Sequence, residues 1–140
     1  MLVRMIFILL VLSCTACATL NPPLYLEFGG KERIAKVSEY FIDEVSFDAD
    51  IYPYFKDSGI ERFKEMFTAH LCQQLDGPCK YTGDTMVDVH RGMNINEADF
   101  NRVVELLMNA MDRANVPVTA QNRLLNKLAP MRAEIMLTKH

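Results

Sequence analysis

The sequence has no cluster of lysine and arginine residues, and no apolar run long enough to cross a membrane. Its formal net charge at pH 7 is −3. Proteins that bind nucleic acid carry a basic patch that faces the phosphates, so this class of partner is not predicted. The main apolar run, residues 6–12, has seven residues, whereas about 20 are needed for a membrane-spanning helix.

Common catalytic motifs are also absent. The chain has no nucleophile elbow, no phosphate-binding glycine loop and no H-E-x-x-H zinc motif, so no hydrolytic reaction is predicted. It shows no strand-like alternation, no internal repeat and no low-complexity tract. The 140 residues, half of them hydrophobic, are enough for one domain with one core.

The first 17 residues have the pattern of a bacterial secretion signal. Arg4 precedes the apolar run, and small residues follow around Cys14 and Cys17. Residues 11–14 and 14–17 each resemble a lipobox, in which the cysteine is acylated and becomes the first mature residue. An ordinary cleaved signal and a signal anchor are the alternatives. We expect an exported protein in the bacterial periplasm, attached to the membrane if Cys14 or Cys17 is lipidated.

A short linker, 18–23, leads to a domain at 24–137 that is helical nearly throughout. A short apolar piece, 24–28, ends at a glycine pair. Apolar residues then recur three and four apart, which places them on one face of a helix. The four stripes are Ile34, Val37, Phe41 and Val45; Ile60, Phe63, Phe67, His70, Leu71 and Leu75; Phe100, Val103, Val104, Leu107, Ala110, Met111 and Ala114; and Leu124, Leu125, Leu128, Met131 and Ile135. The predicted fold class is all-α.

A few residues predict where the helices begin, bend and end. Asn96 is a good N-cap with Asp99 in the first turn. Thr119 is placed to cap the last helix, and Pro130 removes a backbone donor inside it and should kink it. Residues 76–85, rich in glycine, threonine and aspartate, are predicted to form a loop.

Cys72 and Cys79 are candidates for a disulfide. The bacterial envelope is oxidising, so two free thiols there tend to pair. Seven residues separate the cysteines across Gly77-Pro78, and they can close a small loop if the chain turns back. Two unpaired cysteines are the alternative. A zinc site is disfavoured because no second pair of ligands accompanies them.

His90 is the candidate metal ligand. Met86 and His90 are four residues apart in a single predicted turn between Gly83 and Gly92. A neutral imidazole binds iron well when its other nitrogen donates to a carbonyl, and the backbone oxygen of Met86 is the candidate acceptor. The helix stripes and the corner before residue 56 also carry Phe41, Phe55, Phe63, Phe67 and Phe100, which form either a core or a cofactor pocket. A surface histidine remains the alternative for His90.

The ordered set of motifs resembles the group I (N-type) truncated haemoglobins over about residues 24–135. The likeness is carried by Leu24-Tyr25…Phe28-Gly29-Gly30, by Phe55, by Gly77-Pro78…Tyr81-Thr82-Gly83…Met86…His90…Gly92…Ile95…Phe100, and by Leu128-Ala129-Pro130. The resemblance implies a truncated globin fold, with two helices packed over two and haem b between them.

The resemblance also implies roles for individual residues. His90 would bind iron from the proximal side, and the residues that would pack against haem are Phe55, Phe63, Phe67, Tyr81, Met86, Ile95 and Phe100. The distal pocket would contain Ile42, Met66 and His70. His70 would donate to a ligand, approach iron as a sixth ligand, or line a gas path, and a plain core contact is the alternative. Arg91 and Lys64 are candidate partners for the haem propionates, and plain solvated surface charges are the alternative.

The sequence departs from the family on the distal side. Ile42 stands where the family commonly has a tyrosine, and Phe67 where it often has a glutamine. Tyr40 precedes Ile42 by two residues and lies about 200° away around the helix, so it should face elsewhere. A neutral hydrogen bond to a ligand is worth around 1 kcal/mol, and the loss of both donors predicts faster release of O₂.

The predicted function is therefore reversible binding of O₂, NO or CO by a haem protein. The alternative is a haem redox enzyme that acts on NO or nitrite at the bacterial envelope with an unidentified electron donor. A haem-free helical interaction module is the third reading.

The lipobox prediction can be tested by metabolic labelling with a palmitate analogue. We expect the full chain to be labelled in a bacterial host, because the acyl chain is attached to the first mature cysteine. The double variant Cys14→Ser/Cys17→Ser should not be labelled. An unlabelled wild-type protein recovered from the periplasm would show simple secretion instead.

Overall fold

The computed structural model describes residues 22–136, and this part of the chain is helical without a strand. The helices are α1 (Leu24–Phe28), α2 (Gly30–Ser46), the 3₁₀ turn η1 (Tyr52–Tyr54), α3 (Ile60–Gln74), α4 (Met86–Val89), α5 (Glu97–Arg113), α6 (Val118–Leu128), the 3₁₀ turn η2 (Ala129–Met131) and α7 (Arg132–Met136). None of the described helices is long and apolar enough to span a bilayer. The predicted secretion signal lies outside the described residues.

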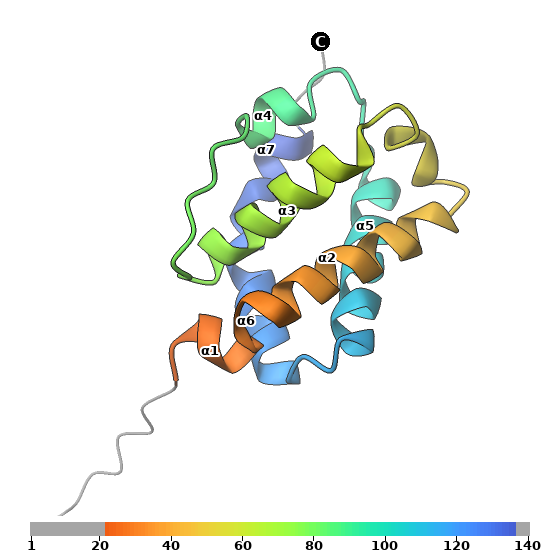
Figure 1. The fold of residues 1–140 in the computed structure, drawn as a ribbon. Helices are drawn as coiled ribbons and strands as arrows, with labels where there is room; N and C mark the ends of the chain where they lie inside the picture. The colour runs from red at the N-terminus through yellow and green to blue at the C-terminus, as the bar shows by residue number, and fades with distance from the viewer. Residues whose placement is uncertain (1–21, 137–140) are drawn as a thin grey trace, which may run out of the picture.

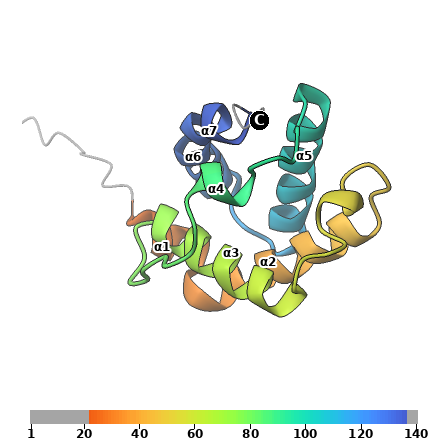
Figure 2. The same cartoon turned by 90° about the horizontal axis from the view of Figure 1, so that it is seen from above.

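The helices form two layers (Figures 1 and 2). Helices α2 and α3 pack together in one layer, and α5 with the α6–α7 segment makes the other. Helix α2 has its most extensive contact with α5, and the short α4 lies at one end of the molecule beside α7 (Figure 1). The prediction of an all-α, two-over-two arrangement is confirmed.

Two glycines make the turn between α1 and α2. Gly29 has φ 108° and Gly30 has φ 68°, a left-handed region that residues with a Cβ rarely adopt. The turn folds α1 back against α6, where Leu24 and Phe28 are fully buried. The glycine pair therefore places α1 at the end of the molecule opposite α4.

The buried core lies where α1, α2, α5 and α6 meet the carboxyl end of α3. Its most deeply buried apolar side chains are Phe28, Ile34, Val37, Leu71, Leu75, Leu106, Ala110, Met111, Ala120 and Leu124. Several apolar side chains near α4 are only partly buried by protein, among them Phe55, Phe63, Phe67, Ile95 and Phe100. The helix stripes are thus packed tightly at one end and left open at the other.

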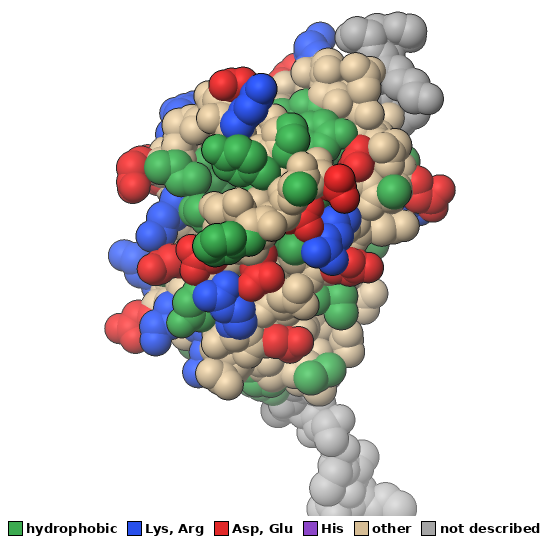
Figure 3. All heavy atoms as spheres, turned by 90° about the vertical axis from the view of Figure 1, so that its right-hand side faces the viewer, with side chains coloured by type: hydrophobic (Ala, Val, Ile, Leu, Met, Phe, Trp, Pro, Cys, Tyr) green, Lys and Arg blue, Asp and Glu red, His purple; other side chains and the backbone are tan. Residues whose placement is uncertain are grey.

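Polar contacts tie α2 to α5 on the outside. Arg113 binds Glu44 at 2.7 Å and Asp43 at 3.2 Å, and its guanidinium lies 4.3 Å from the centre of the Tyr40 ring. Tyr40 therefore faces α5, whereas the sequence predicted only that it faces away from Ile42. Basic and acidic side chains lie next to one another on the face shown in Figure 3.

The predicted helix ends are largely confirmed. Asn96 and Asp99 form a capping box at the start of α5, with Asn96 Oδ1 accepting from the Asp99 backbone N–H at 3.0 Å. Pro130 interrupts the last helix as η2, after which α7 continues. The prediction that Thr119 caps α6 is wrong. Pro117, with φ fixed at −57°, is the N-cap, so the helix begins at Val118 and Thr119 lies inside its first turn. The Thr119 hydroxyl instead donates to Glu27 at 2.6 Å.

The capping box gives a direct test of this fold. We expect Asn96→Ala to lower the free energy of unfolding by about 1 kcal/mol, because the backbone N–H of Asp99 loses its acceptor. Urea unfolding followed by circular dichroism measures the change. The matched control is Asn101→Ala, an exposed position inside the same helix. Equal effects of the two substitutions would contradict a capping role.

Candidate functional site

A cavity of about 580 Å³ opens between the two layers beside α4. This volume is in the range of pockets that bind small molecules and cofactors. Its walls come from every layer of the fold. The lining includes Phe41, Tyr54, Phe55, Arg62, Phe63, Met66, Phe67, His70, Leu71, Tyr81, Met86, Val89, His90, Met93, Ile95, Phe100, Val103, Val104, Leu107, Leu128, Met131 and Ile135.

The cavity brings together nearly all of the residues that the sequence analysis selected. The eight residues assigned to haem contact are all in its wall: Phe55, Phe63, Phe67, Tyr81, Met86, His90, Ile95 and Phe100. Met66 and His70 also line it. The partly buried aromatic side chains noted above are therefore exposed to a shared interior space.

Ile42 differs from its prediction as a pocket residue. It is not in the cavity lining, where α2 contributes Phe41 instead. Phe41 belongs to the buried stripe with Val37 and Val45. A helix turns by about 100° per residue, so Ile42 is rotated away from the stripe and is half-buried beside it.

Four phenylalanine rings form one wall of the cavity. The ring centres of Phe41 and Phe67 are 4.8 Å apart, and those of Phe63 and Phe67 are 5.4 Å apart in a stacked arrangement. Phe55 meets Phe63 edge-on at 5.1 Å. These distances are typical of packed aromatic pairs. The wall they form contains no hydrogen-bond donor.

His90 stands at the carboxyl end of α4 with one nitrogen already committed. Its Nδ1 lies 2.8 Å from the backbone oxygen of Met86, as the four-residue spacing predicted. Because a carbonyl oxygen only accepts, Nδ1 must carry the proton, and the lone pair of the neutral ring is then on Nε2. Burial lowers the pKa of His90, while the hydrogen bond to Met86 acts in the opposite direction. The hydrogen bond to Met86 thus fixes the neutral tautomer with its proton on Nδ1.

His70 enters the same cavity from α3. Its side chain is 9% exposed, and its ring meets the ring of Tyr81 edge-on at 5.2 Å. Within residues 22–136, Nδ1 of His70 is a fully buried polar atom without a hydrogen-bond partner. Burial lowers the pKa of His70, and the nearby His90 lowers it further.

The charged residues around the cavity differ from the expected ones. Lys64 approaches Glu39 at 3.8 Å and is not in the lining, and Arg91 pairs with Asp88 at 2.5 Å. Arg62 lines the cavity instead. It lies one helical turn before Met66 and therefore on the same face of α3, a spacing from which the sequence would have identified it.

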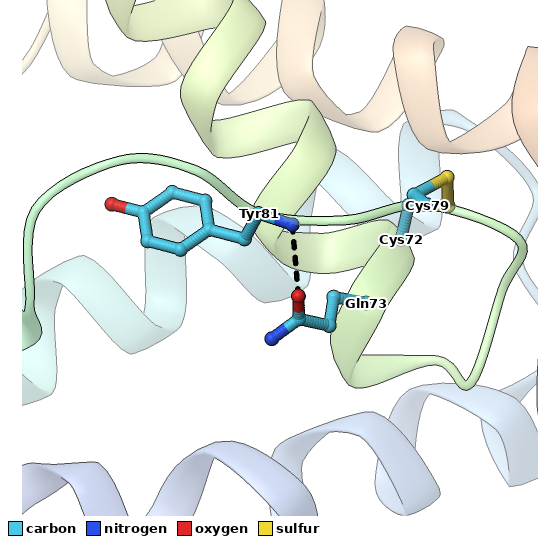
Figure 4. Close-up of a disulfide and its surroundings, with 4 residues drawn as sticks. All are labelled: Cys72, Gln73, Cys79 and Tyr81. Carbon is cyan, nitrogen blue, oxygen red and sulfur yellow. Dashed lines mark hydrogen bonds between the residues drawn. A yellow bond between two sulfur atoms is a disulfide. The ribbon is translucent and has the colours of Figure 1, made fainter.

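Cys72 and Cys79 are joined in a disulfide that ties α3 to the following loop (Figure 4). Their Cα atoms are 5.8 Å apart, within the usual range. A Cβ at Gly77, inside the closed loop, would lie 2.9 Å from the backbone oxygen of Cys72, so the turn requires glycine. The backbone N–H of Tyr81 then donates to the side chain of Gln73 at 2.8 Å. These contacts hold Tyr81 at the cavity.

Comparisons with known proteins agree with this geometry. The pattern of the bacterial-like globin family matches residues 23–137, and the chain belongs to that family. Globins bind haem and, at the haem, diatomic gases.

The similar proteins are truncated haemoglobins. The Group 1 truncated hemoglobin GlbN of Mycolicibacterium paratuberculosis is 31% identical over 112 residues, which cover 80% of this chain and 82% of that protein. The protein of the same name from Nostoc sp. is 25% identical, covering 81% of this chain and 96% of its own. The Fe(III) crystal structure of truncated hemoglobin from Tetrahymena pyriformis superposes with a TM-score of 0.77 at 23% identity, covering 81% of this chain and 97% of that one.

The disulfide can be tested on a purified fragment, residues 18–140, which contains only Cys72 and Cys79. We expect its mass, measured without reductant, to be two hydrogens below that of the dithiol. Reduction should lower the free energy of unfolding by about 2 kcal/mol, because it reopens a short loop in the unfolded chain. The double variant Cys72→Ala/Cys79→Ala should not respond to reductant. Two titratable thiols in the oxidised wild type would refute the bond.

Proposed function

We propose that this protein holds haem b through His90 and reversibly binds O₂, NO or CO. The observation that carries the proposal is His90 itself, in the wall of an aromatic cavity with Nδ1 bound to a backbone carbonyl. Histidines that ligate metals commonly donate their second nitrogen in this way, which fixes the tautomer and the ring orientation. When bound, haem would supply the iron atom at which a gas molecule binds.

The shape and polarity of the cavity fit a flat, largely apolar cofactor. Side chains on both layers present apolar surface to a shared space, and burying such surface is favourable by about 25 cal/mol per Å². Phe63, Phe67 and Phe100 would cover the faces and edges of the ring system. Arg62 would offset negative charge at the cofactor's carboxylate edge.

The protein's own residues account for selective binding of small neutral gases. The wall formed by Phe41, Phe55, Phe63 and Phe67 excludes water and bulky polar molecules, because a polar group buried there would lose its hydrogen bonds. Met86 holds the imidazole of His90 in one tautomer and restricts its rotation. Ligand binding at such a site needs no acid or base from the chain.

Binding of haem should also stabilise the fold. A cofactor that binds only the folded state shifts the folding equilibrium by mass action. Helix α4 and its flanking loops line the cavity and have few protein contacts of their own. Haem binding should therefore stabilise these segments most. We propose that the apo-protein is loosest in α4 and its flanking loops.

The proposal is tested by reconstitution with haem. We expect purified residues 18–140 to give an intense Soret band, which His90→Gly abolishes or grossly shifts because the nitrogen ligand is lost. Added imidazole should restore the wild-type spectrum in His90→Gly by filling the space of the missing ring. Arg91→Ala, at the neighbouring exposed position, is the matched control. A colourless wild type, or an unchanged spectrum in His90→Gly, would refute the assignment.

A further inference from the structure

We propose that His70 is the hydrogen-bond donor of this cavity, and that its Nε2–H stabilises the gas molecule held there. The inference rests on the proposed function, which it extends to the group that sets how tightly and how long a ligand stays. It is carried by the position of the ring, by the burial of one of its nitrogens, and by the use of both tyrosine hydroxyl protons of the cavity within the protein.

The two tyrosines that line the cavity donate their hydroxyl protons within the protein. The hydroxyl of Tyr54 donates to Asp99 at 2.6 Å, and the hydroxyl of Tyr81 donates to the backbone oxygen of Asp84 at 2.8 Å. Both tyrosine protons are therefore used within the protein. The phenylalanine wall offers no donor. The two other side-chain donors in the lining, Ser58 and Arg62, are exposed to solvent, so His70 is the buried donor that a ligand inside the cavity can meet.

His70 is on the face of α3 that lines the cavity. It lies on α3 three residues after Phe67 and seven after Phe63, which places the three side chains on one face of the helix. All three line the cavity. The ring of Tyr81, itself fixed by Gln73, packs against the imidazole. His70 is thus held in the phenylalanine wall.

The surroundings of Nδ1 indicate which nitrogen of His70 carries the proton. Nδ1 is completely buried and has no partner among the described residues. A buried N–H without an acceptor is rarer in proteins than a buried acceptor without a donor. The favoured neutral tautomer therefore carries its proton on Nε2. The ring is 9% exposed, and such burial disfavours the charged form.

The tautomer of His70 is suited to hydrogen-bond donation and not to coordination of iron. A histidine that ligates iron does so through a lone pair on Nε2 and donates from Nδ1, as His90 does to Met86. Nδ1 of His70 has no acceptor to orient it in that tautomer. The two imidazoles of the cavity are thus built for different tasks: His90 as a ligand and His70 as a donor.

Donation from His70 would slow the rapid O₂ release that the loss of both family donors predicts. Ile42 and Phe67 provide no donor, and the sequence alone therefore predicted rapid loss of O₂. His70 supplies a donor from the same helix as Phe67, one turn further along. Ligand retention should then depend on this one side chain.

The experiment compares His70→Leu and His70→Gln in haem-loaded protein, with CO and O₂ as probes. A donor near the oxygen of bound CO lowers the C–O stretching frequency, because it stabilises negative charge there. We expect His70→Leu to raise that frequency and to increase the O₂ dissociation rate about five-fold or more, the factor for one neutral hydrogen bond. His70→Gln retains a donor and should lie between. Glu65→Gln, an exposed position of the same helix outside the cavity lining, should resemble the wild type.

A measurement on the wild type supports the variants. Nitrogen-15 NMR of the diamagnetic CO adduct distinguishes the two tautomers, and we expect the His70 proton on Nε2. A proton on Nδ1 would overturn the proposal, and so would an unchanged C–O frequency and O₂ dissociation rate in His70→Leu. A six-coordinate spectrum without added ligand that is lost in His70→Leu would show coordination instead of donation. A wild type that takes up no haem would overturn the proposed function as well, so the two failures are distinguishable.

Discussion

The hydrogen bond from Nδ1 of His90 to the carbonyl of Met86 is the interaction on which the site depends. It forms within α4, a helix of one turn whose start is capped by Thr85 accepting from the backbone of Asp88 at 3.2 Å. Because the acceptor lies four residues back in the same turn, the orientation of the imidazole follows from local backbone geometry. Longer-range packing then needs only to place this turn at the cavity, which the contact of α4 with α7 does.

The cavity exists because the helices pack closely at the α1 end of the molecule and are held apart at the α4 end. At the α1 end, small and aliphatic side chains such as Ala110 and Ala120 let the helices pack closely, and these residues are fully buried. At the α4 end, phenylalanines keep the layers apart, and the proline at position 130 bends the last helix where it passes the cavity. Close packing at one end stabilises the fold without help from a cofactor, so the other end can remain open to bind one.

Much of this could be predicted from the sequence, because it rests on local patterns. The spacing of Phe63, Phe67 and His70 fixes their common face, and the spacing of Met86 and His90 fixes their hydrogen bond. Predictions failed where a neighbour decides the outcome. Thr119 is displaced from the capping position by Pro117. The resemblance to the family predicted that Ile42 lines the cavity, but Phe41, on the buried stripe of α2, lines it instead. Whether Nδ1 of His70 finds a partner depends on the loop that carries Tyr81, and no periodicity encodes that.

The loop between α3 and α4 links the two histidines physically. It begins at the disulfide of Cys72 and Cys79, continues through Tyr81, which packs against His70, and ends at the turn that carries His90. A segment of this length without helix or strand would ordinarily be mobile, and an imidazole packed against it would share that mobility. The covalent bond and the Gln73 contact remove this freedom at the residues that touch the cavity. The oxidised cysteines therefore serve the geometry of the site as well as the stability of the fold.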